Sequence, residues 1–178
     1  MVCLRKLSRV FWIYLPSLKK EIIILIGFQS LGYSQYNILL EEKISENIGG
    51  FNQTLDINDW LGYSVESIGD IDGDGIGDVA VEVIKDDDGG ADKGAIYILF
   101  LNNNGTVKNH SKISENTGGF TGVLDNNDIL GSAISYLGDM NNDGFVELAI
   151  GAEYDDDGGF NHGAIYILSI DSTGALVS

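Results

Sequence analysis

Carboxylates alternate with small residues in one short stretch of this 178-residue chain. Residues 69–78 read Gly-Asp-Ile-Asp-Gly-Asp-Gly-Ile-Gly-Asp, which places aspartates at positions 70, 72, 74 and 78. Oxygen ligands on alternate residues, with glycines that let the backbone turn sharply, suit a hard cation and above all Ca²⁺. We therefore predict a calcium-binding loop here. The alternative is a solvated acidic hairpin that holds no ion.

The same loop recurs in altered form 69 residues further along. Residues 43–109 align with residues 112–178 without a gap, and 31 of the 67 positions are identical. The segment Gly94–Leu99, for example, is repeated without change as Gly163–Leu168. Self-similarity at a fixed offset is the signature of a repeat architecture, so the chain is predicted to consist of two copies of one structural unit.

Each copy reads as four short strands separated by turns rich in Gly, Asn and Asp. Residues 36–44 resemble a further fourth strand that enters before the first complete unit. This pattern predicts an all-β fold of two four-stranded antiparallel β-propeller blades, an incomplete propeller because propellers have about four to eight blades. We favour part of a longer reading frame, with further blades, over assembly of several copies. The predicted strands are 62–68, 79–84, 95–101 and 106–113 in the first copy, and 131–137, 148–152, 164–170 and a stub at 175–177 in the second.

An N-terminal leader is predicted over residues 1–34, with a signal peptide in residues 19–34. Lys19 and Lys20 supply the charged start, residues 22–28 an apolar core, and Gly32-Tyr33-Ser34 a cleavage pattern before Gln35. The apolar core is too short to span a membrane. The alternative is an uncleaved buried helix, and a start codon downstream of residues 1–18 is a further hypothesis. The first blade with its entering strand then occupies residues 36–113, and the second, truncated blade residues 114–178.

The charge balance excludes several partners. Cleavage after Ser34 would leave 26 acidic residues, the 27 of the whole chain less Glu21, and five lysines, for a net charge of −21. Such a surface disfavours nucleic acid and anionic membranes. The only cysteine, Cys3, would leave with the leader, so no disulfide could stabilise the secreted domain. A bound metal is the expected substitute.

At these residues the chain resembles the FG-GAP repeat family, which forms the blades of the integrin alpha-chain propeller and occurs in many bacterial secreted proteins. Leu61-Gly62 and Leu130-Gly131 stand where the family has Phe-Gly, and Gly151-Ala152-Glu153 stands for its Gly-Ala-Pro element. The first copy has lost that element, with Glu82-Val83-Ile84 in its place. The resemblance covers roughly residues 36–178, and its most specific part is the acidic loop within a duplicated all-strand unit.

The resemblance implies a Ca²⁺ site in each loop, between the first two strands of a blade. Asn141 removes one charge from the second site, and Glu147 is one methylene longer than the family's aspartate. Because affinity for Ca²⁺ falls when ligand charge is removed, the first site is predicted to bind more tightly. The implied ligands are the side chains of Asp70, Asp72, Asp74 and Asp78 with the carbonyl of Ile76, and those of Asp139, Asn141, Asp143 and Glu147 with the carbonyl of Phe145.

Another calcium motif shares part of this spacing. An EF-hand or dockerin begins with the same Asp-x-Asp-x-Asp-Gly run but requires an acid at position 12 and a following helix. Position 12 is Val81 in the first loop and Ile150 in the second, and both lie in β-rich runs. The spacing therefore favours a blade hairpin.

Two other acidic runs, Asp86-Asp87-Asp88 and Asp155-Asp156-Asp157, invite a second metal site. In a blade they fall between the second and third strands, on the face opposite the calcium loops. Three adjacent aspartates cannot all point at one ion, so a solvated turn is predicted. The alternative is an acidic patch on the ligand-facing side.

The long connections 45–60 and 114–129 lie on that same face and are the predicted recognition surface, because loops on a rigid scaffold carry binding. Phe51, Phe120 and Trp60 could stack on a ligand there, although packing between blades is the favoured interpretation.

Four aromatic or titratable side chains elsewhere are given structural roles. Tyr97 and Tyr166 alternate with apolar neighbours and are predicted to pack in the core or at the interface between blades. His110 and His162 stand alone, and His162, which replaces Lys93 of the first copy, fits an exposed loop.

No catalytic motif is recognisable, whether a nucleophile with its base, a His-Glu-x-x-His or a phosphate-binding loop. The chain is therefore predicted not to be an enzyme. We predict a secreted, calcium-binding propeller module at the cell surface or outside the cell, which binds an extracellular protein or glycan in adhesion. Two alternatives stay open: a non-catalytic accessory propeller of a larger secreted enzyme, and purely structural spacer repeats.

Overall fold

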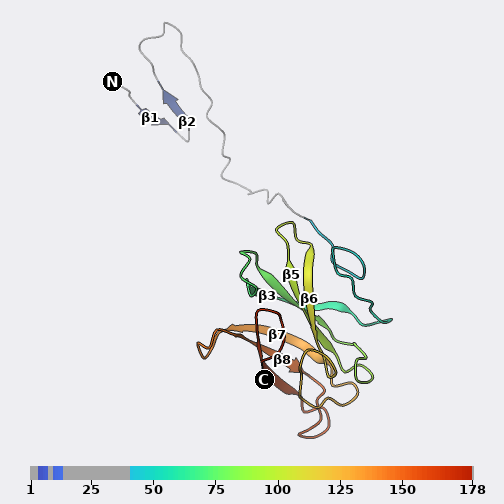
Figure 1. Cartoon of the computed structure of the whole chain (residues 1–178). Helices are drawn as coiled ribbons and strands as arrows, with labels where there is room; N and C mark the ends of the chain where they lie inside the picture. Colours follow the sequence, from blue (N-terminus) through green and yellow to red (C-terminus); the bar gives the residue numbers. More distant parts are fainter. Residues whose placement is uncertain (1–3, 8–9, 14–40, 178) are drawn as a thin grey trace. The chain divides into compact units, whose positions relative to one another are not determined.

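The computed structural model describes residues 4–7, 10–13 and 41–177 (Figure 1). These residues form strands and turns and contain no helix, and hence none long and apolar enough to cross a membrane. The chain divides into two units, Met1–Leu39 and Leu40–Ser178. In the first unit, β1 (Leu4–Leu7) pairs antiparallel with β2 (Val10–Ile13). The predicted signal peptide lies outside the described residues.

The first sheet is a four-stranded antiparallel meander in the second unit. Its strands follow one another in the order β3-β4-β5-β6, as predicted for a blade. Each begins and ends within one residue of its predicted bounds. The strands are β3 (Leu61–Gly69), β4 (Asp78–Val83), β5 (Ala95–Leu101) and β6 (Val107–Ile113).

The second sheet repeats this meander with three strands, β7 (Leu130–Gly138), β8 (Val146–Ala152) and β9 (Ala164–Ile170). The stub predicted at 175–177 forms one isolated bridge, Leu176 with Ile170, instead of a fourth strand. Residues 41–44, the described part of the predicted entering strand, lie outside any strand. The all-β class is confirmed, and the two antiparallel sheets are consistent with incomplete propeller blades.

Apolar side chains from both sheets form one core between them. Its members include Ile68 and Ile96 from the first sheet and Leu148 and Ile150 from the second, all fully buried. The opposite face of the first sheet is covered as well, because Phe51 packs there against buried side chains of β4 and β5. With both faces covered, β4 and β5 are buried along nearly their whole length, and β5 reads as a continuous apolar run rather than an alternating one.

The first strand of each sheet has a β-bulge at the same place, directly before the acidic loop. In β3 the register against β4 shifts between Ser67 and Gly69, and in β7 it shifts between Tyr136 and Gly138. Gly69 and Gly138 have φ values of 75° and 72°, where a side chain would be strained. Each acidic loop therefore leaves its strand through a glycine that the sequence repeats.

Candidate metal centre

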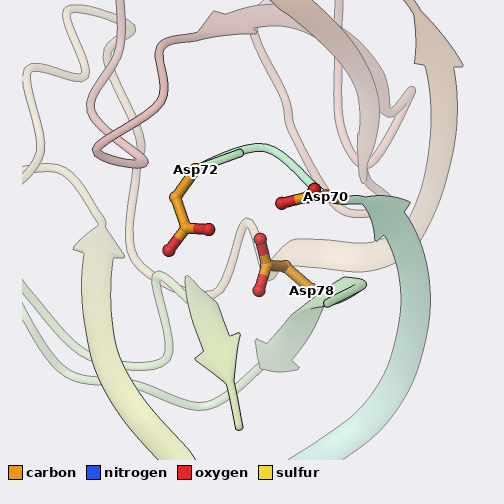
Figure 2. Close-up of side chains that lie close together, drawn as sticks. All are labelled: Asp70, Asp72 and Asp78. Carbon is orange, nitrogen blue, oxygen red and sulfur yellow. The ribbon is translucent and has the colours of Figure 1, made fainter. Parts of the chain in front are cut away.

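Three carboxylates of the β3–β4 loop converge on one point, as Figure 2 shows for Asp70, Asp72 and Asp78. One oxygen from each lies within 4.8 Å of the others. Two oxygens on opposite sides of a Ca²⁺ ion, each about 2.3–2.6 Å from it, are about 4.6–5.2 Å apart. All three side chains can therefore reach a single ion of this size, and an all-oxygen set of carboxylates matches the preference of a hard cation.

Backbone amides hold the loop in this shape. The two carboxylate oxygens of Asp70 accept hydrogen bonds from the N–H groups of Asp74, at 3.0 Å, and Gly75, at 2.8 Å. Asp72 Oδ1 also accepts from the Asp74 N–H, at 3.2 Å. Gly75 has φ 90°, a conformation that L side chains rarely adopt. The aspartates thus serve both as turn formers and as candidate ligands.

Asp78 closes the loop from inside the sheet. Its side chain is fully buried, and it accepts hydrogen bonds from the N–H groups of Ile71 and Leu101, both at 3.1 Å. Burial raises the pKa of Asp78, and these two hydrogen bonds offset the rise only in part. A cation at the loop would neutralise this buried charge, which gives the protein a physical reason to bind one.

A lysine from the far edge of the same sheet already faces the acidic loop. Lys108, on β6, places its Nζ 2.7 Å from Asp72 Oδ2 and also forms an ion pair with Asp74. The hydrogen bond from Lys108 lowers the pKa of Asp74, and the two aspartates raise the pKa of Lys108. The second copy has Val177 at the equivalent position, so this built-in cation belongs to the first loop alone.

The other two predicted ligands of the first loop lie beside the cluster. Asp74 is outside the three-carboxylate group and binds Lys108 instead. Its Oδ1 accepts a hydrogen bond of 2.8 Å from the N–H of Ile76, which fixes the backbone at that residue. Coordination by Asp74 and by the Ile76 carbonyl stays a prediction.

The second loop repeats the backbone hydrogen bonds of the first. Asp139 accepts from the N–H groups of Asp143 and Gly144, at 3.1 and 3.0 Å, and Phe145 donates to Asp143 at 2.9 Å. Asn142 takes the left-handed position of Gly73 with φ 62°. The duplicated sequence therefore produces a duplicated loop conformation.

The two changed ligand positions of the second loop are both engaged within the protein. Asn141 accepts a hydrogen bond from the Asp143 N–H and donates its amide to Asp143 Oδ2 at 2.7 Å. Glu147 is buried and accepts from the Met140 N–H and the Ser169 hydroxyl, at 2.8 and 2.9 Å. The longer Glu147 side chain thus uses Ser169, where Asp78 uses a backbone N–H. Among the described residues, the three-carboxylate group lies at the first loop, and coordination by the second loop stays a prediction.

The predicted solvated turn at the two Asp triplets is wrong for their first residues. Asp86 and Asp155 are buried, 4% and 3% exposed. Lys112 Nζ lies 2.9 Å from Asp86 Oδ2, and the Tyr166 hydroxyl donates to Asp155 at 3.0 Å. Each of these buried aspartates binds a side chain outside its own turn, so the local run of aspartates does not predict the burial.

Tyr97, Phe120 and Tyr166 pack in the two cores as predicted, whereas Phe51 is buried against the first sheet alone instead of between blades. Phe51 and Tyr97 are buried and meet edge to face with ring centroids 5.1 Å apart, and Phe120 meets Tyr166 at 5.2 Å. A second exception is Trp60, which is 54% exposed with Lys85 Nζ 5.0 Å from its ring centroid.

The two histidines also take different positions. His162 lies in an exposed loop, as predicted. His110 is half-buried against the ring of Phe51, and burial lowers the pKa of His110.

Sequence comparison adds one relative to this all-β fold with an acidic loop. No family model matches the chain. Over 112 residues the chain is 34% identical to integrin alpha-PS5 from Drosophila melanogaster. The match covers 62% of this chain and 10% of that protein, so the chain spans about a tenth of its relative. The chain is therefore similar to part of an integrin alpha chain, in agreement with the resemblance seen in its motifs.

Proposed function

We propose that this chain is a secreted, calcium-binding β-propeller module of the FG-GAP or integrin-alpha type, which binds an extracellular protein or glycan. The observation that carries the proposal is the convergence of Asp70, Asp72 and Asp78 within a loop that the sequence repeats in a second blade-like sheet. The similarity to integrin alpha-PS5 supports the same class.

In this proposal the metal stabilises the scaffold. The ion neutralises carboxylates that would otherwise repel one another and binds the end of β3 to the start of β4, where Asp78 lies. The full ligand set would be that implied by the family resemblance. Nothing in the arrangement requires a chemical reaction at the ion, since its role is to fix the hairpin.

The ligand surface is proposed on the connections 45–60 and 114–129, at the opposite end of the strands from the acidic loops. Each connection exposes an apolar side chain, Ile57 at 93% in the first and Val123 at 70% in the second. The second packs partly on the first sheet through the buried Phe120 and Leu124. A protein or glycan array probed with and without Ca²⁺ would identify a partner for this surface.

Isothermal titration of metal-free protein with CaCl₂ tests the metal site directly. Wild-type protein is expected to bind Ca²⁺, with the site at the first loop the tighter of the two, and to bind Mg²⁺ more weakly because a smaller ion needs shorter contacts. Asp72→Asn should remove the tighter event and leave the other. Absence of heat for both ions, or an unchanged isotherm in Asp72→Asn, would refute calcium binding at the first loop.

Secretion is tested separately by expressing the chain with its leader in a secreting host. N-terminal sequencing of the product in the medium should begin at Gln35. Recovery of the intact leader from inside the cell would contradict this part of the proposal.

A further inference from the structure

The contact between the two sheets has two sides, and each has an equivalent elsewhere in the duplicated chain. The first sheet contributes Ile68, Ile96 and Ile98, all fully buried. The second sheet contributes the start of β7, where Ile129 and Leu130 are buried and Ile134 packs into the same core. An offset of 69 residues therefore names the residues that would form the same contact a second time.

The side of the second sheet that matches Ile68, Ile96 and Ile98 is exposed. The equivalent residues are Leu137, 38% exposed, Ile165, 74% exposed, and Ile167, 56% exposed. Phe160, in the loop before β9, adds a further side chain that is 86% exposed. We call Leu137, Phe160, Ile165 and Ile167 the trailing face. Apolar side chains gathered in this way on one face indicate a surface for a partner.

The first sheet exposes the matching half of the contact at its own start. Trp60, Leu61 and Val65 are the equivalents of Ile129, Leu130 and Ile134. Trp60 and Val65 are 54% and 56% exposed, and Leu61 is half-buried. We call these three residues the leading face. Residues 41–177 thus carry both halves of a contact that they already make once within themselves.

Polar groups at the internal contact also have equivalents on the two faces. Lys93 reaches across from the first sheet and donates to Glu115 and to the carbonyl of Leu124, both at 2.5 Å. At the trailing face the equivalent of Lys93 is His162, and beside the leading face the equivalent of Glu115 is Glu46. Both side chains are exposed, and an imidazole N–H can donate to a carboxylate as the Lys93 ammonium does.

We propose that the trailing face binds the leading face of a second copy of this chain, so that copies associate head to tail in the geometry of the internal contact. The repeat pattern alone favours further blades over assembly of copies, but the structure gives a reason for a second copy: its leading face is exposed and offers apolar residues in the spacing that β7 uses inside the chain. The contact is heterologous, so it leaves one leading and one trailing face free in every dimer.

Sedimentation equilibrium of the full chain tests the proposal with two blocked variants. Ile165→Asp with Ile167→Asp blocks the trailing face, and Val65→Asp blocks the leading face, each at exposed positions where a charge is tolerated. Tyr154→Asp is the matched control, since Tyr154 is 43% exposed in the β8–β9 loop outside both faces. Circular dichroism of each variant should match that of the wild type.

Wild type and Tyr154→Asp should show concentration-dependent association beyond the 19.2 kDa monomer. Each blocked variant should stay monomeric alone, but an equal mixture of the two should form a dimer of twice that mass and nothing larger, because one compatible pair of faces remains. Monomeric wild type at all concentrations would overturn the proposal. So would self-association of Val65→Asp alone, which would show that trailing faces pair with each other. If a further repeat unit of a longer chain covered the trailing face in place of a second copy, this would also refute the assigned occupant.

Discussion

Lys108 occupies the position of a counter-ion at the first acidic loop. Its ammonium pairs with Asp72, one of the three converging carboxylates, and with Asp74 beside them. A Ca²⁺ ion bound there would be repelled by this charge and would compete with it for Asp72. The affinity of the first loop therefore depends on a residue from another strand as well as on its own carboxylates.

Replacing Lys108 by Met is expected to raise the Ca²⁺ affinity of the first loop roughly three- to tenfold at low salt, with a smaller gain at high salt because exposed charges are screened. Calorimetric titration at two salt concentrations measures this. Lys85→Met is the matched control, because Lys85 pairs with Asp92 away from the loop. A lower affinity in Lys108→Met would show that the lysine organises the loop instead of competing for it.

Glu82 is a second residue whose charge conflicts with its place. It is fully buried on β4 beside Gly131 of the second sheet, and neither carboxylate oxygen accepts a hydrogen bond. Burial raises the pKa of Glu82 to about 7, and the Ser64 hydroxyl nearby acts in the opposite direction. The native state holds this proton more tightly than the unfolded chain, so its contribution favours the fold below pH 4.5 and is lost as the pH rises towards 7.

Between acidic and neutral pH, ionisation of Glu82 should lower the free energy of unfolding of the wild type by about 3 kcal/mol. Glu82→Gln should not show this loss. Urea unfolding near pH 4 and pH 8, with chelator present at both, gives the two free energies of unfolding. The variant should match wild type at the lower pH and exceed it at the higher one. Glu153→Gln, at an exposed site, should behave as wild type. Equal pH profiles for Glu82→Gln and wild type would mean that Glu82 ionises without cost.

At the scale of the elements, the turn between β4 and β5 joins the two sheets through its backbone. Gly94, with φ 85°, lies so close to the second sheet that a Cβ atom would stand 2.1 Å from the Leu130 carbonyl oxygen. The Leu130 N–H donates to the carbonyl of the preceding residue, Lys93, at 2.8 Å. Any side chain at position 94 would force the sheets apart.

Gly94→Ala is expected to destabilise the protein by roughly 2–4 kcal/mol, from a strained φ together with a backbone clash. Gly163→Ala is its repeat-matched control, because Gly163 has φ 74° but its Cβ would meet the nearest backbone oxygen at 3.2 Å. That variant should show the smaller loss. Equal losses in denaturant unfolding would assign the whole effect to backbone strain and none to the contact between sheets.

The elements themselves are the part of the structure that the sequence predicts best. Glycine and asparagine turns separate apolar runs, so strands such as Ala95–Leu101 and Ala164–Ile170 were predicted with their observed bounds. The loop conformation also follows from local residues. The weaker prediction concerned pairing between distant residues: residues 175–177 make one bridge instead of a strand, and neither the burial of Asp86 nor the position of Lys108 has a local signal.

At the scale of the whole molecule, the proposed metal is expected to contribute to global stability. A ligand that binds only the folded state adds about 2.7 kcal/mol at a hundred times its Kd. For a chain of this size that corresponds to roughly 5–10 °C in Tm. Thermal unfolding with excess Ca²⁺ and with chelator should differ by this amount, and Asp70→Asn with Asp78→Asn should reduce the difference. An unchanged Tm in chelator would show that calcium has no structural role.

The exposure of Trp60 makes the molecule its own spectroscopic probe. The chain has two tryptophans, and Trp12 belongs to the predicted leader, so the secreted form would retain Trp60 alone. Half in solvent beneath the Lys85 ammonium, this indole should emit at long wavelength. Its equivalent inside the chain, Ile129, is 9% exposed. Association of copies would therefore appear as a blue shift of intrinsic fluorescence, readable during dilution without any added label.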